Sequence, residues 1–375
     1  MLALIFHVIV LIVFSGGICR GYPVNVHRVL SRKPLDHGVF RLPRLDEVLR
    51  KGITPVIKNN ETNVRHRRIG ATDLFISEVG LGTMTFGRYV EERTAHELLD
   101  HAVGHGINLI DTSDCGELPI ISGWLRKQGV NCRAKLVLAT KVSKNSQVLK
   151  EVEASLSCLN VDYIDLLQLE DGDDIEEVLD TLRTLLATGK IRYWGLLNVT
   201  PWRLLRYSQL ANQCGIPIPV TVQLTYNLLS RNDVEKGFVE LSRPQNNGIN
   251  IIANGALAGG VLTGKYLEYL DPTTSGRLLR YPSYMSRYRG SLAARAVRDY
   301  YDIAIGHGFP NLCVMSLRWV FTRPFILSTL IGVSDLYQLR ENLACLDPSL
   351  VITEAVEREI NQIHWKWRDP IRILE

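Results

Sequence analysis

The chain reads Tyr163-Ile-Asp-Leu-Leu-Gln-Leu-Glu170 at the point that decides its fold, and the next similar run reads Ile191-Arg-Tyr-Trp-Gly-Leu-Leu-Asn198. Between the two runs, apolar residues such as Leu182 and Leu185 recur at the spacing of a helix. Neither run alternates apolar and polar residues strictly, as a strand with one face in water would. Near-continuous apolar runs are typical of parallel strands that helices cover. The unit therefore predicts a strand, a helix and a second, parallel strand.

Eight runs of this kind occur along the chain, and the first six begin about 28 residues apart. That interval holds one strand and one helix with short connections. Eight strand–helix units in about 300 residues is the count of a (β/α)8 barrel. We therefore predict an α/β fold, a single-domain (β/α)8 TIM barrel over residues 67–369. The predicted strands are Val79–Met84, Ile107–Asp111, Lys135–Val142, Tyr163–Glu170, Ile191–Asn198, Pro219–Tyr226, Ile249–Leu257 and Phe325–Gly332.

A doubly wound dinucleotide-binding sheet is the alternative fold. It would need Gly-x-Gly-x-x-Gly after the first strand, but the chain reads Gly80-Leu-Gly-Thr-Met-Thr85, which lacks the third glycine. The barrel is therefore favoured. The long interval from Leu257 to Phe325 predicts one large loop and a pair of helices. Because loops after the carboxyl ends of barrel strands build the active site, we expect this loop to border it.

Composition excludes several classes of protein. The 375 residues are 46% hydrophobic and 22% charged, which is ordinary for a globular protein and unlike a disordered chain, a collagen or a coiled coil. The net charge of +4 is small, and no basic stripe with interleaved aromatic residues occurs, so we expect no nucleic-acid partner. The seven cysteines are scattered without a Cys-x-x-Cys pair, so we expect buried thiols and no metal site.

The basic charge is concentrated before the predicted barrel, since residues 1–70 hold 12 basic and 4 acidic residues. Leu2–Phe14 is apolar except for His7, and it is too short to span a bilayer comfortably. Small residues follow it, so we predict a signal peptide over residues 1–19, with an uncleaved anchor as the alternative. Residues 20–66 are basic without an apolar period, which predicts a disordered segment or one that resembles a plastid transit peptide.

This leader predicts entry into the secretory pathway. The plastid, reached through a bipartite leader, is one expected destination, and secretion or the ER lumen is the alternative. In each case we expect no membrane span after processing, because no other segment approaches the necessary length.

Seven stretches carry a recognisable pattern. They are Arg68-Ile-Gly-Ala-Thr-Asp-Leu-Phe-Ile-Ser-Glu-Val-Gly-Leu-Gly-Thr-Met-Thr-Phe-Gly87, Gly106-Ile-Asn-Leu-Ile-Asp-Thr-Ser113, Ala139-Thr-Lys-Val142, Tyr163-Ile-Asp-Leu-Leu-Gln-Leu169, Gly189-Lys-Ile-Arg-Tyr-Trp-Gly195, Leu257-Ala-Gly-Gly-Val-Leu-Thr-Gly-Lys-Tyr266 and Gln338-Leu-Arg-Glu-Asn342. In this order they resemble the aldo-keto reductases over residues 67–369, most closely the longer plant chloroplast and bacterial members and the potassium-channel β subunits. The resemblance implies a (β/α)8 barrel with NADPH lying across the carboxyl ends of its strands.

In that family a tyrosine donates a proton as hydride arrives at a carbonyl carbon. An aspartate–lysine pair lowers the pKa of the tyrosine, and a histidine orients the carbonyl. Asp111 and Lys141 match the aspartate and the lysine. The tyrosine is not matched, because Cys115 or Gly116 stands in its place, and Glu170 stands where the histidine would be. The candidate catalytic residues are therefore Asp111, Lys141, Glu170 and Cys115.

Each of these residues has a second interpretation. Asp111 and Lys141 can be an ion pair kept for packing, since removing one partner of a buried pair is costly. Glu170 is either catalytic or a neutralising third member of that pair. Cys115 is either a plain thiol or a substitute acid whose pKa a nearby lysine would lower.

The resemblance is stronger at the expected adenosine and phosphate end of the cofactor. Gly259, Gly260 and Lys265 match a loop that crosses the pyrophosphate, where close backbone approach and a positive charge both help. Around the nicotinamide, Leu197 and Asn254 stand where the family has polar and aromatic residues. The residues implied for NADPH or NADP binding are Thr83, Met84, Asn198, Gln223, Leu257, Gly259, Gly260, Lys265, Arg277, Gln338, Glu341 and Asn342.

Two functions from different classes remain open, beside the third possibility of a barrel that has lost the cofactor as well. The first is an NADP-dependent oxidoreductase of the aldo-keto reductase type that acts on a small-molecule carbonyl substrate with impaired or altered catalysis. The second is a non-catalytic NADPH-binding pseudoenzyme that serves as a redox sensor or a partner-binding barrel. Binding of NADPH without turnover would separate the second from the first.

Overall fold

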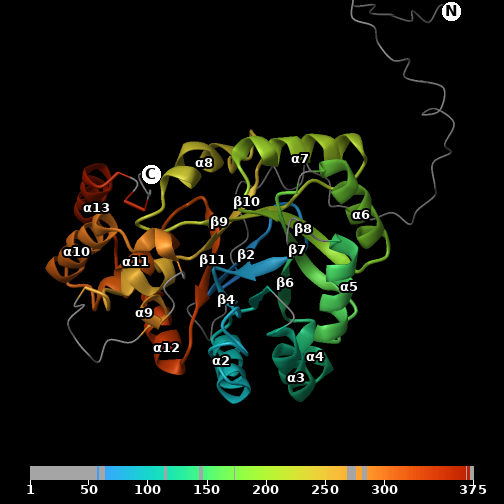
Figure 1. Cartoon of the computed structure of the whole chain (residues 1–375), viewed down its shortest axis with the longest axis horizontal. Coiled ribbons are helices and arrows are strands. Elements are labelled where there is room, and N and C mark those ends of the chain that lie inside the picture. Colours follow the sequence, from blue (N-terminus) through green and yellow to red (C-terminus); the bar gives the residue numbers. More distant parts are fainter. Residues whose placement is uncertain are drawn as a thin grey trace, which may run out of the picture. The chain divides into compact units, whose positions relative to one another are not determined.

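The computed structural model describes residues 57–58, 64–113, 116–142, 147–172, 174–267, 276–280, 285–368 and 370–371. Eight parallel strands in these ranges close into a barrel with helices around it (Figure 1). The strands are β4 (Val79–Gly82), β5 (Leu109–Thr112), β6 (Val137–Val142), β7 (Ile164–Glu170), β8 (Ile191–Leu197), β9 (Thr221–Thr225), β10 (Asn250–Asn254) and β11 (Ile326–Gly332). Each strand neighbours the next along the chain, and β11 closes the barrel against β4. The predicted (β/α)8 barrel is confirmed.

Every predicted strand run overlaps one barrel strand, and the ends differ by a few residues. The run predicted over Ile249–Leu257 stops as a strand at Asn254. Gly255 follows with a φ of 61°, a conformation that turns the chain away from the sheet. Apolar residues therefore continue past the strand into the loop that borders the carboxyl face.

Helices fill the intervals between the strands, and side-chain caps explain where several of them begin. The Asp174 carboxylate accepts a hydrogen bond from the Glu177 amide, and the Thr200 hydroxyl accepts one from the Arg203 amide. No helix among the described residues has the length and hydropathy needed to cross a bilayer. The helices of the first five intervals are α2 (Glu92–Gly104), α3 (Leu118–Gln128), α4 (Val130–Arg133), α5 (Val148–Leu159), α6 (Ile175–Ala187) and α7 (Pro201–Gln213).

The later intervals are less regular. As predicted, the chain between β10 and β11 forms a long loop followed by two helices, α10 (Ser291–Gly306) and α11 (Leu312–Phe321). Two further helices follow β11, α12 (Leu336–Ala344) and α13 (Glu354–Lys366). The shorter elements are η2 (Val234–Phe238), α8 (Val239–Leu241), η3 (Ala258–Thr263), α9 (Arg277–Arg280) and η4 (Ser286–Tyr288).

A small antiparallel sheet precedes the barrel, formed by β1 (Ile57–Lys58), β2 (Arg65–Arg68) and β3 (Phe75–Ser77). Ile69 and Ile76 from this sheet are fully buried in the same cluster as residues of the barrel interior. The β2–β3 hairpin therefore closes the end of the barrel at which the strands begin.

We expected no packed element before Arg67, and the structure differs there. Strand β1 and the first residues of β2 lie in the basic 20–66 segment, and the Arg65 guanidinium pairs with the Glu78 carboxylate. Strand β2 carries only Arg and His, so its sequence has no apolar period from which a strand could be predicted. The predicted signal peptide of residues 1–19 and the rest of that basic segment lie outside the described residues.

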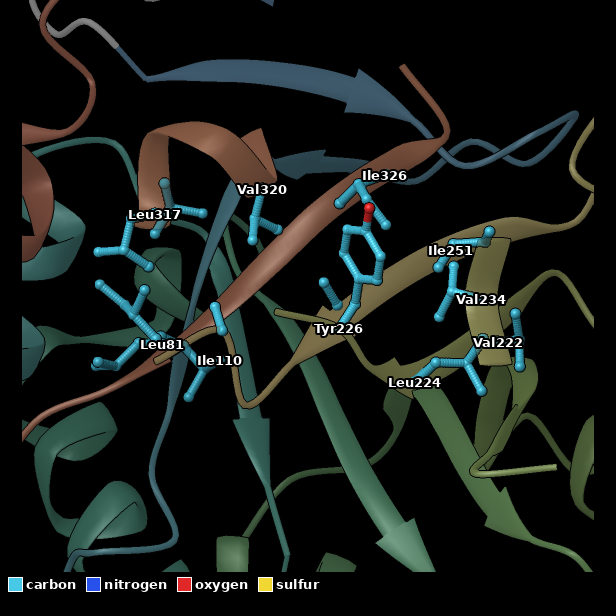
Figure 2. Packing of buried hydrophobic residues seen from close by; sticks show 14 of the residues in the cluster. Leu81, Ile110, Val222, Leu224, Tyr226, Val234, Ile251, Leu317, Val320 and Ile326 are labelled. Carbon is cyan, nitrogen blue, oxygen red and sulfur yellow. The ribbon is translucent and has the colours of Figure 1, made fainter. Parts of the chain in front are cut away.

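Two layers of apolar side chains form the core. The larger layer lies between the strands and the helices, and Figure 2 shows Leu317 and Val320 of α11 together with Leu81 and Ile326 of the strands. Full burial of a side chain of this size contributes roughly 1.5–3 kcal/mol. Ten fully or nearly buried residues form the inner layer: Ile69, Leu74, Ile76, Leu109, Val137, Ala139, Leu166, Ile252, Leu327 and Leu330.

The wall between β8 and β9 requires a glycine. A Cβ atom on Gly195 would lie 2.1 Å from Thr221 Oγ1, 2.6 Å from the Thr221 carbonyl oxygen and 2.8 Å from Gln168 Oε1. The amide of Gln168 donates to the Thr221 hydroxyl over 2.9 Å, so both polar groups are held in place. A glycine at this position therefore lets a buried polar pair fit inside the barrel.

Candidate functional site

A pocket of about 1170 Å³ opens at the carboxyl ends of the barrel strands. Asp111 of β5, Lys141 of β6, Gln223 of β9 and Asn254 of β10 line one part of it, and the loop after β10 with the start of α12 lines the rest. This is the face on which TIM barrels carry their active sites. Its volume is above the usual range for small-ligand pockets, so it has room for a ligand of dinucleotide size.

An ion pair lies at the strand ends. The Lys141 ammonium donates to Asp111 Oδ2. The Asp111 side chain is 3% exposed and that of Lys141 is 23% exposed. Gln223 Nε2 donates to the other carboxylate oxygen of Asp111 over 2.9 Å. Three of the predicted site residues, from three different strands, are thus brought together by direct contacts.

The same network continues to a residue that sequence analysis treated only as a departure from the family. Asn254 Nδ2 donates to Gln223 Oε1 over 3.3 Å, and the Thr225 hydroxyl donates to Asn254 Oδ1 over 2.9 Å. Asn254 therefore holds Gln223, which in turn holds Asp111. Its only sign in the sequence is a polar residue that ends an apolar strand.

The loop after β10 brings backbone and positive charge to the pocket. Gly259 and Gly260 have φ angles of 67° and 96°, which glycine adopts without strain. A Cβ atom on Gly260 would lie 3.4 Å from Lys265 Cε, so the side chain of Lys265 packs against the backbone of Gly260. Arg287 and Arg298 line the same pocket and were not predicted. This concentration of positive charge suits an anionic ligand such as a phosphate.

The start of α12 supplies the other predicted binding residues. The Gln338 amide group donates to Ser334 Oγ over 2.8 Å and to Asp335 Oδ2 over 2.7 Å, which fixes its side chain beside the pocket. The Asp335 carboxylate also caps the helix by accepting from the Gln338 backbone amide. The helix start is therefore rigid before any ligand arrives.

Helix α11 supports the next turn of α12 from behind. Asn311 Nδ2 donates to Glu341 Oε1 over 2.8 Å, and the Cys313 thiol donates to Asn342 Oδ1 over 3.3 Å. Burial raises the pKa of the Cys313 thiol, so the thiol keeps its proton and remains a donor. Glu341 and Asn342 both line the pocket, as predicted.

The remaining predicted residues are placed unevenly. Met84, Asn198 and Leu257 line the pocket. Thr83 does not line the pocket, because it is fully buried. Its hydroxyl donates a hydrogen bond to the backbone carbonyl oxygen of Asp111 over 3.1 Å. Glu170 is the last residue of β7 and is not part of the pocket lining either.

Two predicted residues cannot be placed by their side chains. Cys115 and the side chain of Arg277 lie outside the described part of the chain, although the Arg277 backbone belongs to α9. Among the described residues, no group of three or more His, Cys, Asp or Glu side chains could hold a metal ion.

Sequence analysis also missed several residues that the fold brings to the pocket. Tyr89 reaches it from the loop after β4, and Ser113 reaches it from the loop after β5. Tyr301 and Tyr337 line it from α10 and α12. Ser113 ends a stretch that resembles the family, but no pattern in the sequence predicts that any of these four residues lines the pocket.

Comparisons with known proteins agree with this arrangement. The model of the Aldo/keto reductase family matches residues 78–364. An "Aldo-keto reductase" of Babesia bovis is 57% identical over 285 residues, which cover 64% of this chain and 100% of that protein. "Protein tas" of Escherichia coli (strain K12) is 34% identical over 354 residues, covering 82% of this chain and 99% of the relative. "Uncharacterized oxidoreductase YqkF" of Bacillus subtilis (strain 168) is 28% identical over 313 residues, covering 78% and 95%.

Proposed function

Because the chain belongs to the aldo/keto reductase family, we propose that it transfers a hydride between NADP(H) and the carbonyl carbon of a small substrate, with weakened proton donation. One observation carries the proposal. The buried Asp111–Lys141 pair and the cationic loop around Lys265 line one continuous pocket, so a ligand held by its phosphates at the loop can reach the pair.

The residues present fit a phosphorylated dinucleotide. Gly259 and Gly260 allow the backbone to approach a pyrophosphate, and Lys265, Arg287 and Arg298 offer positive charge to it. Gln338 and Asn342, from α12, add polar groups to the pocket that hydrogen bonds hold in place. Bound NADPH would supply the hydride.

The chain's own groups would act on the carbonyl oxygen. Negative charge develops on that oxygen as hydride arrives, and the Lys141 ammonium is the cation that the described strand ends bring to the pocket lining. Asp111 holds the ammonium in one position and is itself held by Gln223. The pair would therefore stabilise the negative charge that develops on the carbonyl oxygen.

Weak proton donation follows from the rest of the pocket. The family tyrosine is not matched in the sequence, and the described part of the pocket lining contains no histidine. A positioned general acid contributes roughly 10²–10⁴-fold to a rate. We therefore propose turnover on simple aldehydes about a thousandfold below that of an ordinary enzyme of this type.

Cofactor binding is the first test. The full chain is titrated with NADPH and followed by nucleotide fluorescence, together with Lys265→Ala and the control Lys150→Ala, an exposed lysine of α5 outside the pocket. Loss of a charged hydrogen bond of about 1.5–3 kcal/mol should weaken binding roughly tenfold or more in Lys265→Ala. The control should bind as wild type does. Absence of wild-type binding at millimolar NADPH would overturn the proposal.

A second candidate function is a non-catalytic NADPH-binding barrel that acts as a redox sensor or binds a partner. The hydrogen-bond network from Lys141 through Asp111 and Gln223 to Asn254 favours this non-catalytic candidate. A polar network in which each side chain is hydrogen-bonded to the next can be kept for stability alone. NADPH binding with no turnover on any carbonyl would select this candidate.

A further inference from the structure

We propose that Ser113, held by the carboxyl group of Glu117, exchanges the proton with the substrate oxygen. The inference rests on the hydride transfer proposed above and names the group that replaces the unmatched tyrosine. Ser113 ends one of the stretches that resemble the family, but no role was predicted for it, and its contact with Glu117 became visible only in the folded structure.

Ser113 has the right place for this role. It follows β5 directly, two residues after Asp111, and it lines the same pocket as Asp111 and Lys141. Its hydroxyl donates to Glu117 Oε2 over 3.3 Å, and its backbone amide donates to Glu117 Oε1 over 2.6 Å. One carboxyl group thus orients both the main chain and the side chain of Ser113.

Glu117 is held from a second strand as well. The Thr83 hydroxyl, at the end of β4, donates to Glu117 Oε1 over 2.9 Å. Glu117 is 1% exposed although it stands at the start of α3 and not in a strand. A buried carboxyl group is costly unless it is hydrogen-bonded, and the donors from Thr83 and Ser113 meet this requirement while they hold the carboxyl group beside a pocket serine.

The loop that carries the pair is closely packed. A Cβ atom on Gly87 would lie 2.9 Å from the Gly116 carbonyl oxygen, so the loops after β4 and β5 touch through their backbones. Gly87 also has a φ of 75°, which favours glycine there. The contact places the backbone beside Glu117 against the loop after β4.

The chemistry balances in both directions. In alcohol oxidation, the substrate O–H proton passes to Ser113 Oγ, the Ser113 proton passes to Glu117 Oε2, and the hydride on the carbinol carbon leaves to NADP⁺ as the C=O bond forms. In carbonyl reduction the same steps run backwards, and the proton on the product hydroxyl comes from Glu117 through Ser113. Ser113 is the catalytic residue in this scheme, and Glu117 is a positioning residue that also stores the proton.

Tyr89 is the competing donor. It lines the pocket from the loop after β4 and is 38% exposed. A phenol is a better acid than an alcohol, but Tyr89 lies in a different loop from Asp111, whereas Ser113 follows Asp111 by two residues and is held by a buried acid. Tyr89→Phe therefore belongs in the test.

The test uses the full chain, NADPH and 4-nitrobenzaldehyde. Ser113→Ala should lower kcat by about 10²-fold or more, the scale of a lost general acid. Ser113→Thr keeps the hydroxyl and should recover most of that loss. A normal solvent deuterium isotope effect on kcat should be present in wild type and absent from Ser113→Ala. NADPH affinity should not change, which separates a role in proton transfer from a structural one.

Further variants control the outcome. Glu117→Gln should lower kcat as Ser113→Ala does, with its thermal melting recorded because the residue is buried. Ser242→Ala and Glu153→Gln, both outside the pocket, should keep wild-type turnover. Turnover of Ser113→Ala within about threefold of wild type, or selective loss in Tyr89→Phe, overturns the relay. Wild type that binds NADPH but never reduces the aldehyde overturns the catalytic function itself, and the relay with it.

Discussion

Replacement of Lys141 by methionine tests whether the ion pair at the strand ends stabilises the barrel. The substitution removes the ammonium but keeps an unbranched apolar stem. It leaves the Asp111 carboxylate, 3% exposed, with Gln223 as its remaining described partner. Breaking a buried pair on one side costs about 3–5 kcal/mol, because an uncompensated charge stays buried.

The double variant Asp111→Asn/Lys141→Met provides the decisive comparison. It removes both charges and keeps an amide that Gln223 can still contact. Replacing both partners of a buried pair is often neutral, so we expect most of the lost stability to return. The matched control is Lys190→Met, which breaks an exposed pair with Glu153 and should cost at most about 1 kcal/mol.

The measurement is urea unfolding of the full chain without cofactor, read by tryptophan fluorescence. A loss of about 3 kcal/mol corresponds to a melting temperature lower by roughly 5 °C for a barrel of about 300 residues. The reasoning fails if Lys141→Met loses no more stability than Lys190→Met. It also fails if the double variant is as unstable as the single one, since the cost would then lie in packing and not in charge.

Three other outcomes follow from the structure. Gly195→Ala should destabilise the barrel by about 1–3 kcal/mol, because the new Cβ atom would overlap the Thr221 backbone. The control Gly104→Ala places its Cβ atom in open space, so it should be neutral or stabilising in the same urea assay. Burial alone would raise the pKa of Glu357, but hydrogen bonds from Arg323 outweigh burial, so the pKa is lowered. The pair therefore stabilises the fold at pH values above the usual glutamate pKa, and this stability is lost as the pH falls. Glu357→Gln should flatten the acid side of a profile of melting temperature against pH, and an unchanged slope would contradict this reasoning. N-terminal sequencing of native protein should begin after residue 19, and a chain beginning at Met1 would refute the processing prediction.

The barrel could be predicted from sequence because its signal is repeated. Strand runs that begin about 28 residues apart, each followed by an apolar helix period, leave few other folds. The β2–β3 hairpin could not be predicted, because β2 reads Arg-His-Arg-Arg and contains no apolar residue. The buried apolar side chains of the hairpin are Ile69, which follows β2, and Ile76, which lies in β3. Periodicity reports a strand only where one face is apolar.

The site was predictable where residues stand at strand ends. Asp111, Lys141 and Gln223 were named from the sequence, and the closed barrel brings them into contact because parallel strands end at one face. Arg287 and Arg298 were missed, since no local pattern shows that the short element η4 and the helix α10 present them to the pocket. Glu170 was named because it stands where the family has a histidine, yet it is not part of the pocket lining.

Contacts that depend on the detailed geometry of side chains were the hardest to predict. Ser113 and Glu117 are four residues apart at the passage from β5 into α3, and their contact depends on how that turn closes. Asn254 was noted only as the loss of an aromatic residue, whereas in the structure it holds Gln223 through a hydrogen bond. Such roles arise from side-chain geometry and have no periodic trace in the sequence.

Transfer of deuterium from NADPH labelled at nicotinamide C4 to an activated aldehyde tests the central claim most directly. The full chain is incubated with labelled cofactor and 4-nitrobenzaldehyde, and the alcohol is analysed by mass spectrometry over time. We predict deuterated alcohol at a rate about a thousandfold below the ordinary turnover of roughly 1 s⁻¹ or more, with none from Lys141→Met. Absence of deuterium from the product of wild-type protein saturated with cofactor would contradict the account.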